Sequence, residues 1–278
     1  MAAGRVQPLD VRSRAEGAPD RPATACGPVV TASDADHDLE IIAWSMRLST
    51  IRRYFHQRFW ERETTEAEFA GKLEGMPRLE TVAEHSWHVA DTIMILAPRF
   101  PAIDMPRAVM LAILHDKMEI SIGDISPVGR DGTGNRTHAF NPQARQRKSE
   151  SEREAAELYL RRLNNHAQLI QRVLLEELLN ESTDESKFVK AVDKLQALVY
   201  VVEKKAGGMS DSHLKFTMQY SSKVLRWPPL SMHLDRLRER LFVDTAKQRN
   251  VEVAKIRRIA LGEQDALFNF SEVASLDY

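Results

Sequence analysis

Apolar residues recur at intervals of three and four along most of the chain, which is the spacing of one face of an α-helix. The pattern predicts helical segments near residues 39–51, 89–96, 108–115, 155–163, 188–202 and 234–242. Pro98 and Pro101 follow the second segment, and Ser149 and Glu152 have the spacing of a capping box before the fourth. No stretch shows convincing strand alternation, and no glycine-rich phosphate loop follows a strand. The sequence therefore predicts an all-α fold.

Three stretches lack this periodicity. Residues 1–36 are rich in Ala, Gly, Pro, Arg and Asp, and cannot bury enough surface to offset the entropy of ordering, so we expect a disordered leader. Residues 61–80 and 126–147 contain several Gly and Pro residues and are typical of long loops. We therefore expect one domain at 37–245, followed by a C-terminal tail or packing segment at 246–278.

Composition excludes several classes of function. Lys and Arg total 39 and Asp and Glu total 40, so the net charge of −1 argues against a nucleic-acid-binding surface. The longest apolar run is only about as long as residues 109–114, far short of the roughly 20 residues that span a membrane. The single cysteine, Cys26, excludes an intramolecular disulfide and a cysteine-rich zinc site. The start of the chain lacks an apolar signal segment, so the expected location is the cytoplasm.

Acidic and imidazole side chains within the apolar helical stripes are candidates for chemistry, because burying such groups without compensation is costly. His115, Asp116 and Glu119 should converge on one side of a single helix. Asp193 lies among apolar residues of a later helix, and His85 lies near the start of an earlier one. A divalent metal would explain these inward-facing groups, although satisfied polar groups in the core remain the alternative.

The motifs Glu84-His85-Ser86, His115-Asp116-x-x-Glu119-x-x-x-Gly123-Asp124 and Val192-Asp193-Lys194 resemble those of HD-domain metal-dependent phosphohydrolases. Within that superfamily the chain is most similar to the 5′-nucleotidase (5′-deoxynucleotidase) branch, over about residues 39–225. The resemblance implies an α-helical bundle around a central metal site. The four ligands that it implies for one divalent transition metal (cobalt, manganese, zinc or iron) are His85, His115, Asp116 and Asp193.

The resemblance also implies roles in catalysis and substrate binding. Glu119 would orient or deprotonate the metal-bound water. Asp124 would help to select the sugar, and Arg53 would face the phosphate, although Tyr54 stands where the branch has Trp. Arg78, seven residues before His85, also fits the branch and is a third candidate for substrate binding. The implied reaction is hydrolysis of a nucleoside 5′-monophosphate. Because the branch often forms dimers, the resemblance also implies a homodimer.

Two alternatives remain open at this level. The same scaffold can cleave cyclic nucleotides, triphosphates or alarmones, although the Glu-Asp pair of alarmone hydrolases has no clear counterpart; Glu176-Glu177 is the nearest. The chain could also be a metal-stabilised nucleotide-binding module without turnover, against which the presence of Glu119 and Asp124 argues. His88, one turn after His85, is either a polar neighbour of the site or a ligand for a second ion.

Overall fold

The computed structural model describes residues 30–54, 79–129, 131–205 and 209–262. The chain divides into two units, residues 1–37 and 38–278, and the second unit holds every candidate site residue. The α-helices are α1 (Ala32–Met46), α3 (Val82–Leu96), α4 (Met105–Leu114), α5 (Glu119–Ile122), α6 (Pro142–Leu160), α7 (Asn165–Asn180), α8 (Asp184–Lys205), α9 (Asp211–Ser221), α10 (Ser231–Arg249) and α11 (Val253–Leu261). Short 3-10 helices cover Arg47–Thr50, Ala97–Arg99, Ser222–Arg226 and Pro228–Leu230. The prediction of an all-α fold is confirmed, and the described residues contain no β-structure beyond a single bridge between Arg52 and Thr81.

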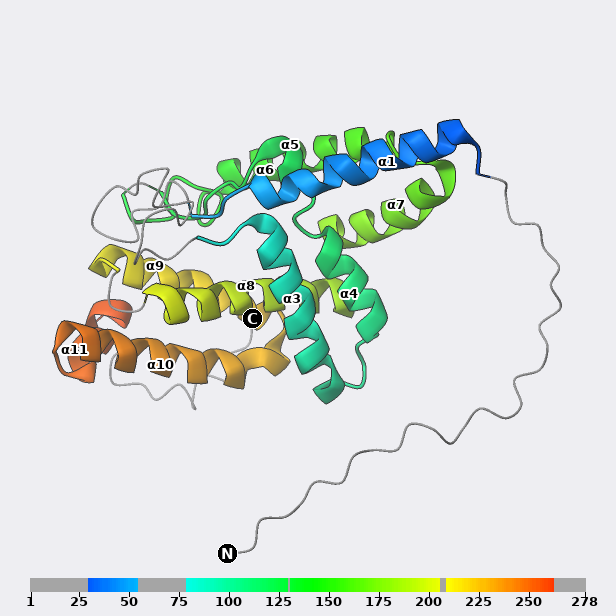
Figure 1. The fold of residues 1–278 in the computed structure, drawn as a ribbon. Coiled ribbons are helices and arrows are strands. Elements are labelled where there is room, and N and C mark those ends of the chain that lie inside the picture. Colours follow the sequence, from blue (N-terminus) through cyan, green and yellow to red (C-terminus); the bar gives the residue numbers. More distant parts are fainter. Residues whose placement is uncertain (1–29, 55–78, 130, 206–208, 263–278) are drawn as a thin grey trace, which may run out of the picture. The chain divides into compact units, whose positions relative to one another are not determined.

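The core of the second unit forms around α3, α4 and α8, which lie side by side (Figure 1). Each contributes fully buried apolar side chains: Val89 and Ile93 from α3, Leu111 from α4, and Phe188 and Val192 from α8. These are the residues whose spacing predicted the helices, because a helix stripe that faces other helices must be apolar. Helices α3 and α8 carry His85 and Asp193, and His115 and Asp116 directly follow α4, so the packing of the core positions the site.

The start of α3 is fixed by local hydrogen bonds. The Thr81 side chain accepts from the backbone N–H of Glu84, and the Glu84 carboxylate accepts from the backbone N–H of Thr81 at 2.7 Å. This capping box satisfies two of the free N–H groups at the helix start. It places His85 in the first turn of α3, where the side chain is fully buried.

The prediction that residues 126–147 form a loop is wrong for residues 142–147, and the helix that follows does not start at Ser149. Helix α6 begins at Pro142, and the Asn141 side chain caps it by accepting from the backbone N–H of Ala144 at 3.1 Å. Its first turns lie at the surface, since its buried residues start at Ala155, and an exposed helix has no apolar periodicity to reveal it. Helix α7 was not predicted separately; the Asn164 side chain caps it, four residues after α6 ends.

The C-terminal segment contributes to the same core. Helix α10 continues to Arg249, so the expected boundary at residue 245 falls inside it, and it ends at Asn250 in the left-handed conformation. Helix α11 follows and buries Ile256 and Ala260 while packing on α9 and α10. Residues 1–29 of the expected disordered leader lie outside the described residues, whereas residues 32–36 belong to α1, so the leader prediction is wrong for these five residues. Among the helices described, none combines the length and apolarity that crossing a bilayer requires.

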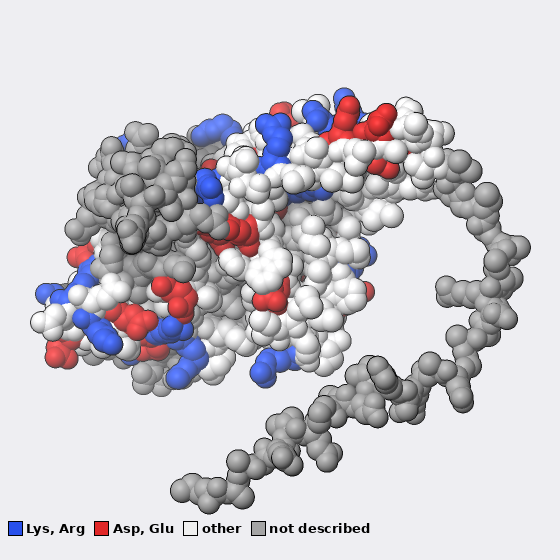
Figure 2. All heavy atoms as spheres, in the orientation of Figure 1, with Lys and Arg blue, Asp and Glu red and all other residues white. Residues whose placement is uncertain are grey.

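Basic and acidic side chains are interspersed on the face of the molecule shown in Figure 2. This mixture agrees with the near-equal totals of 39 basic and 40 acidic residues in the sequence.

Candidate metal centre

Two imidazole rings from distant parts of the chain meet at the centre of the site. The Nε2 atoms of His85, on α3, and His115, which follows the last residue of α4, are 3.3 Å apart. The Nδ1 atom of His85 bonds to the amide oxygen of Gln196 at 2.7 Å, and the Nδ1 atom of His115 bonds to the carbonyl oxygen of Ala112 at 2.6 Å. Both Nδ1 atoms must donate in these bonds, since each partner is an acceptor. Both rings therefore present Nε2 to the same point.

Two carboxylates approach the same point. The Oδ2 atom of Asp116 lies 3.1 Å from Nε2 of His115 and 3.6 Å from Nε2 of His85. The Oδ1 atom of Asp193, on α8, lies 3.1 Å from Nε2 of His85. His85, His115 and Asp116 offer ligand atoms that all lie within 4.8 Å of one another, and Asp193 joins them through His85.

The helix that was expected to carry His115, Asp116 and Glu119 together is interrupted. Helix α4 ends at Leu114, a tight turn covers residues 115–118, and α5 begins at Glu119. The backbone N–H of Lys117 bonds to the carbonyl of Leu114, and that of Glu119 bonds to the carbonyl of Asp116, with the three-residue spacing of a 3-10 turn. The expectation of one continuous helix is therefore wrong. The turn follows the apolar run of α4, at the point where His115 and Asp116 face the other ligand candidates.

The charges at this point fit a cation. Burial raises the pKa of Asp116 and of Asp193, but the neighbouring cations and imidazoles outweigh it, so both pKa values lie below the usual range and both side chains are ionised. Burial, together with Arg53, lowers the pKa of His85, so this imidazole is neutral. Burial also lowers the pKa of His115, yet Asp116 and Asp193 outweigh that effect and raise it, which shows that the site attracts positive charge.

The donor set also fits a metal geometrically. Two Nε2 lone pairs that face each other at 3.3 Å repel unless a proton or a cation lies between them. Two nitrogen ligands at about 2.1 Å from one ion, separated by an angle of about 90–110°, are about 3.0–3.4 Å apart. The neutral His85 imidazole and the ionised carboxylates are also in the protonation states that a metal requires of its ligands.

Glu119 lies beside the cluster, and one of its carboxylate oxygens has no partner among the described residues. The side chain is buried, and among the described residues its Oε2 atom has no hydrogen-bond partner. Burial raises the pKa of Glu119 well above its usual range, and the negative charges of Asp116 and Asp124 add to this effect. A buried acceptor without a partner indicates that a water or ligand completes the site.

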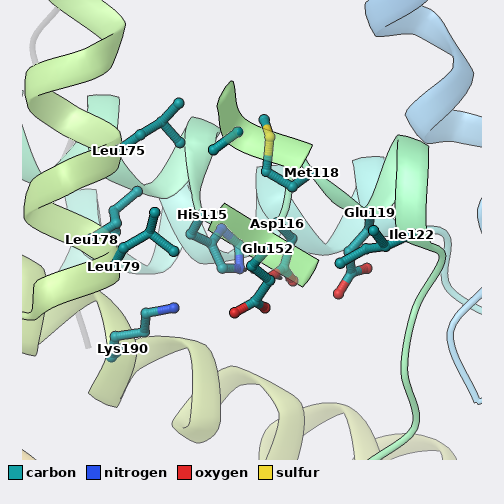
Figure 3. A pocket seen from close by; sticks show the side chains of 11 residues that line it. His115, Asp116, Met118, Glu119, Ile122, Glu152, Leu175, Leu178, Leu179 and Lys190 are labelled. Atoms are coloured by element: carbon teal, nitrogen blue, oxygen red, sulfur yellow. Dashed lines mark ion pairs between the residues drawn. The ribbon is translucent and has the colours of Figure 1, made fainter. Parts of the chain in front are cut away.

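A small cavity of about 20 Å³ lies next to these groups (Figure 3). His115, Asp116 and Glu119 line it together with Glu152 from α6 and Lys190 from α8. The volume suffices for one water molecule. The cavity flanks the cluster on the side of α6 and α7, and neither His85 nor Asp193 lines it.

The segment before α3 brings Arg53 to the site. Residues 51–54 run antiparallel to 79–82, with the backbone N–H of Arg53 bonded to the carbonyl of Glu80 and that of Val82 bonded to the carbonyl of Ile51. The Arg53 guanidinium is largely buried, donates to Glu80 at 2.8 Å and lies 5.0 Å above the ring of Tyr54. The Tyr54 ring stacks in turn on Tyr200, and its backbone has a φ of 66°, a strained value for a large residue.

Asp124 reaches the same region by a different route. Gly123 ends α5 with a φ of 75°, which glycine adopts readily, and the chain then turns. Burial raises the pKa of Asp124, while Arg53 and a hydrogen bond to the backbone of Tyr54 oppose this effect. Arg53 and Asp124, two of the predicted substrate-binding residues, thus lie near each other beside the ligand cluster. The third, Arg78, lies outside the described residues.

Sequence reasoning missed three polar side chains at the site. Glu80 and Gln196 are buried behind His85, and Lys148 on α6 forms an ion pair with Glu152. Burial lowers the pKa of Lys148, but Glu152, Glu119 and Asp116 raise it above its usual range, which places this cation near the cluster. The i, i+4 spacing of Lys148 and Glu152 could have revealed their pairing on a helix. Glu80 gave no such signal, since it falls in the stretch expected to be a loop.

Comparisons with known proteins agree with this architecture. Residues 70–228 match the HD domain family. The 5′-deoxynucleotidase hdd1 of Schizosaccharomyces pombe is 28% identical over 172 residues, which cover 60% of this chain and 79% of that protein. The 5′-deoxynucleotidase HDDC2 of Bos taurus is 30% identical over 156 residues, which cover 51% of this chain and 69% of that protein.

A solved structure has a similar fold. The crystal structure of a protein described as a predicted metal-dependent phosphohydrolase from Magnetospirillum magnetotacticum MS-1 superposes with a TM-score of 0.55. The match covers 80% of this chain and 98% of that one, at 20% sequence identity. The chain belongs to the HD-domain family, and the resemblance to HD-domain phosphohydrolases that the motifs indicated is confirmed.

Proposed function

We propose that this protein is a metal-dependent phosphomonoesterase that hydrolyses nucleoside 5′-monophosphates to nucleoside and phosphate. The observation that carries the proposal is the convergence of two imidazole nitrogens and two carboxylates beside the Oε2 atom of Glu119, which has no hydrogen-bond partner in the described parts of the chain. A structural cluster would leave no buried carboxylate oxygen without a partner, whereas a hydrolytic site needs a base next to a bound water.

We assign four side chains to one divalent transition metal: His85, His115, Asp116 and Asp193. Imidazole nitrogens favour such an ion over calcium. When bound, the ion would lower the pKa of a water molecule and polarise a phosphoryl oxygen. Glu119 would accept a hydrogen bond from that water and act as its proton acceptor, through the Oε2 atom for which the described residues supply no partner.

The substrate phosphate would lie between the ligand cluster and the cations around it. Arg53 offers a guanidinium at one side, and Lys148 offers an ammonium group whose pKa already responds to Glu119 and Asp116. Asp124, near Arg53, would accept hydrogen bonds from sugar hydroxyl groups. The names of the similar proteins from Schizosaccharomyces pombe and Bos taurus support deoxynucleoside monophosphates as the first substrates to test.

The test combines elemental analysis of the purified protein with a phosphate-release assay over ribo- and deoxyribonucleoside 5′-monophosphates. Asp116→Ala should lose both the metal and turnover, whereas Glu119→Gln should keep the metal and lose about 10²–10⁴-fold in kcat. Release of pyrophosphate from a triphosphate, without phosphate release from any monophosphate, would assign a different reaction to the site. Full activity of a metal-free Asp116→Ala preparation would refute the proposal.

A further inference from the structure

One buried carboxylate lies behind both the ligand cluster and Arg53. The Glu80 side chain has no exposed surface. Its Oε2 atom accepts from the Arg53 guanidinium at 2.8 Å. Its Oε1 atom bonds to Nδ1 of His88 at 2.7 Å and accepts from the amide nitrogen of Gln196 at 3.3 Å. The backbone N–H of Glu80 is itself held by the hydroxyl oxygen of Tyr200, at 3.2 Å. Glu80 therefore has a fixed position from which it holds three side chains.

Gln196 connects Glu80 to the ligand His85 by two hydrogen bonds. Because the amide nitrogen of Gln196 donates to Glu80, its amide oxygen must face His85, where it accepts from Nδ1–H at 2.7 Å. That bond holds the proton on Nδ1 and leaves the lone pair of His85 on Nε2, directed at the cluster. A hydrogen bond of this kind sets both the tautomer and the orientation of a ligand imidazole. Glu80 thus acts on His85 through Gln196, with its Oε2 atom 3.7 Å from the same Nδ1.

The second group that Glu80 holds is the Arg53 guanidinium. Its buried positive charge is balanced by Glu80, and the raised pKa of Arg53 reflects Tyr54, Glu80, Asp124 and Asp116, which outweigh its burial. A charge-assisted hydrogen bond between guanidinium and carboxylate is strong and directional. Glu80 therefore holds in place a cation that the proposed function assigns to the substrate phosphate.

We propose that Glu80 is a positioning residue that couples metal binding to phosphate binding, by holding His85 through Gln196 and Arg53 directly. The inference rests on the proposed function for the role of Arg53. The effect of Glu80 on metal binding through Gln196 and His85 is independent of the identity of the substrate. Both effects depend on the negative charge of Glu80, since its carboxylate accepts from the Arg53 guanidinium and the Gln196 amide at the same time.

The test uses the full chain, with cobalt(II) as the metal and inorganic phosphate as the ligand. Glu80→Gln keeps the shape of the side chain and removes its charge, so that the amide of Gln196 loses its charged acceptor. We expect the dissociation constant for cobalt to rise about 10- to 100-fold, the range typical when a residue behind a metal ligand is replaced. We also expect phosphate, measured at saturating cobalt, to bind about 10-fold more weakly. The visible absorption of the cobalt-loaded protein should change as His85 becomes less constrained.

Two further variants separate the effect of Glu80 on cobalt binding from its effect on phosphate binding. Gln196→Leu removes the hydrogen bonds that connect Glu80 to His85. This variant should bind cobalt more weakly and keep its phosphate affinity at saturating cobalt. Adding Glu80→Gln to Gln196→Leu should then cost little further cobalt affinity, because both changes interrupt one path, and should still weaken phosphate binding. Fully additive losses of cobalt affinity would refute the proposal that Glu80 acts on His85 through Gln196, since the free-energy changes of independent mutations add and those of coupled ones do not.

Controls distinguish positioning from a general effect on folding. Glu177, on α7, is also buried and is also paired with an arginine, Arg107, but it touches none of the site residues named above. Glu177→Gln should lower thermal stability and leave cobalt and phosphate affinities unchanged. Glu80→Asp keeps the charge and provides a second variant if Glu80→Gln fails to fold; its shorter side chain should weaken both affinities.

The two proposals fail in different ways. A wild-type chain that binds cobalt but releases phosphate from no nucleoside monophosphate would refute the proposed function, while its cobalt affinity would still report on Glu80. A folded Glu80→Gln variant with wild-type affinities for both cobalt and phosphate would refute the role of Glu80 and leave the proposed function intact. A wild-type chain that binds no divalent metal would overturn both.

Discussion

The rings of His85 and His115 meet edge to face, with centroids 5.2 Å apart and planes at 61° to each other. Each ring is held from behind, one by a side-chain amide and the other by a backbone carbonyl. The two nitrogens that face each other are therefore oriented by the protein before any ion binds. A site prepared in this way binds a metal without the cost of ordering its ligands.

Metal removal should destabilise the folded protein. A ligand that binds only the native state at 100 times its dissociation constant adds about 2.7 kcal/mol of stability, and about 2–4 °C of Tm accompanies each kcal/mol in a domain of this size. Chelation should therefore lower the Tm by roughly 5–11 °C, and Asp116→Ala should abolish this metal-dependent difference. The measurement is thermal unfolding with and without a chelator, and equal melting curves for the wild type under both conditions would contradict the assignment of the ligands.

Glu119 should make the stability of the metal-free protein depend on pH. Burial raises its pKa above the unfolded value of about 4.3, so the folded state favours the protonated form. The contribution of this group to stability is complete below pH 4.3 and is lost as the pH rises toward the folded pKa. Each unit of pKa difference corresponds to about 1.4 kcal/mol.

The variant Glu119→Gln removes this penalty. In the presence of a chelator it should be more stable than the wild type at pH 7 and similar to it near pH 4. Urea unfolding at the two pH values measures the difference. A metal-free Glu119→Gln variant that is less stable than the wild type at pH 7 would show that the carboxylate is not buried in the manner described.

Lys148 should contribute to catalysis through its charge. Its ammonium group lowers the pKa of Glu119, so Lys148→Met should move the acidic limb of the pH–rate profile to higher pH. If Lys148 also contacts the phosphate, kcat/KM should fall by about 10-fold, the loss of one charged hydrogen bond of about 1.5 kcal/mol. Arg147, the exposed neighbour on α6, is the matched control, and Arg147→Met should leave the pH profile unchanged. Equal profiles for the two variants would exclude Lys148 from the site.

The start of α6 can be tested by replacing the two candidate caps. Asn141 caps the helix in the structure, so Asn141→Ala should cost about 0.5–2 kcal/mol of stability. Ser149, which the sequence suggested as a cap, lies inside α6, so Ser149→Ala should change stability by less than about 0.5 kcal/mol. Denaturant unfolding of both variants decides between the two positions, and the opposite ranking would restore the helix start at Ser149.

The parts of this fold that the sequence predicted depend on local patterns. Val89 and Ile93 in α3 and Phe188 and Val192 in α8 marked buried helix faces, since apolar periodicity records which side of a helix is covered. The first turns of α6 escaped prediction because they are exposed. The motifs around His85, His115 and Asp193 indicated the family because residue type and spacing along the chain suffice to recognise them.

Other features were decided by tertiary structure. Glu80 and Gln196 are 116 residues apart in sequence and bond across the core, and no local pattern specifies such a pair. The backbone pairing of residues 51–54 with 79–82 brings Arg53 to the site across a long intervening segment. The sequence alone determined the helical class of the chain and the residue types capable of the chemistry. Which groups stand behind His85 and beside Glu119 follows from how the helices pack, because burial, pairing and pKa depend on neighbours that are distant in the chain.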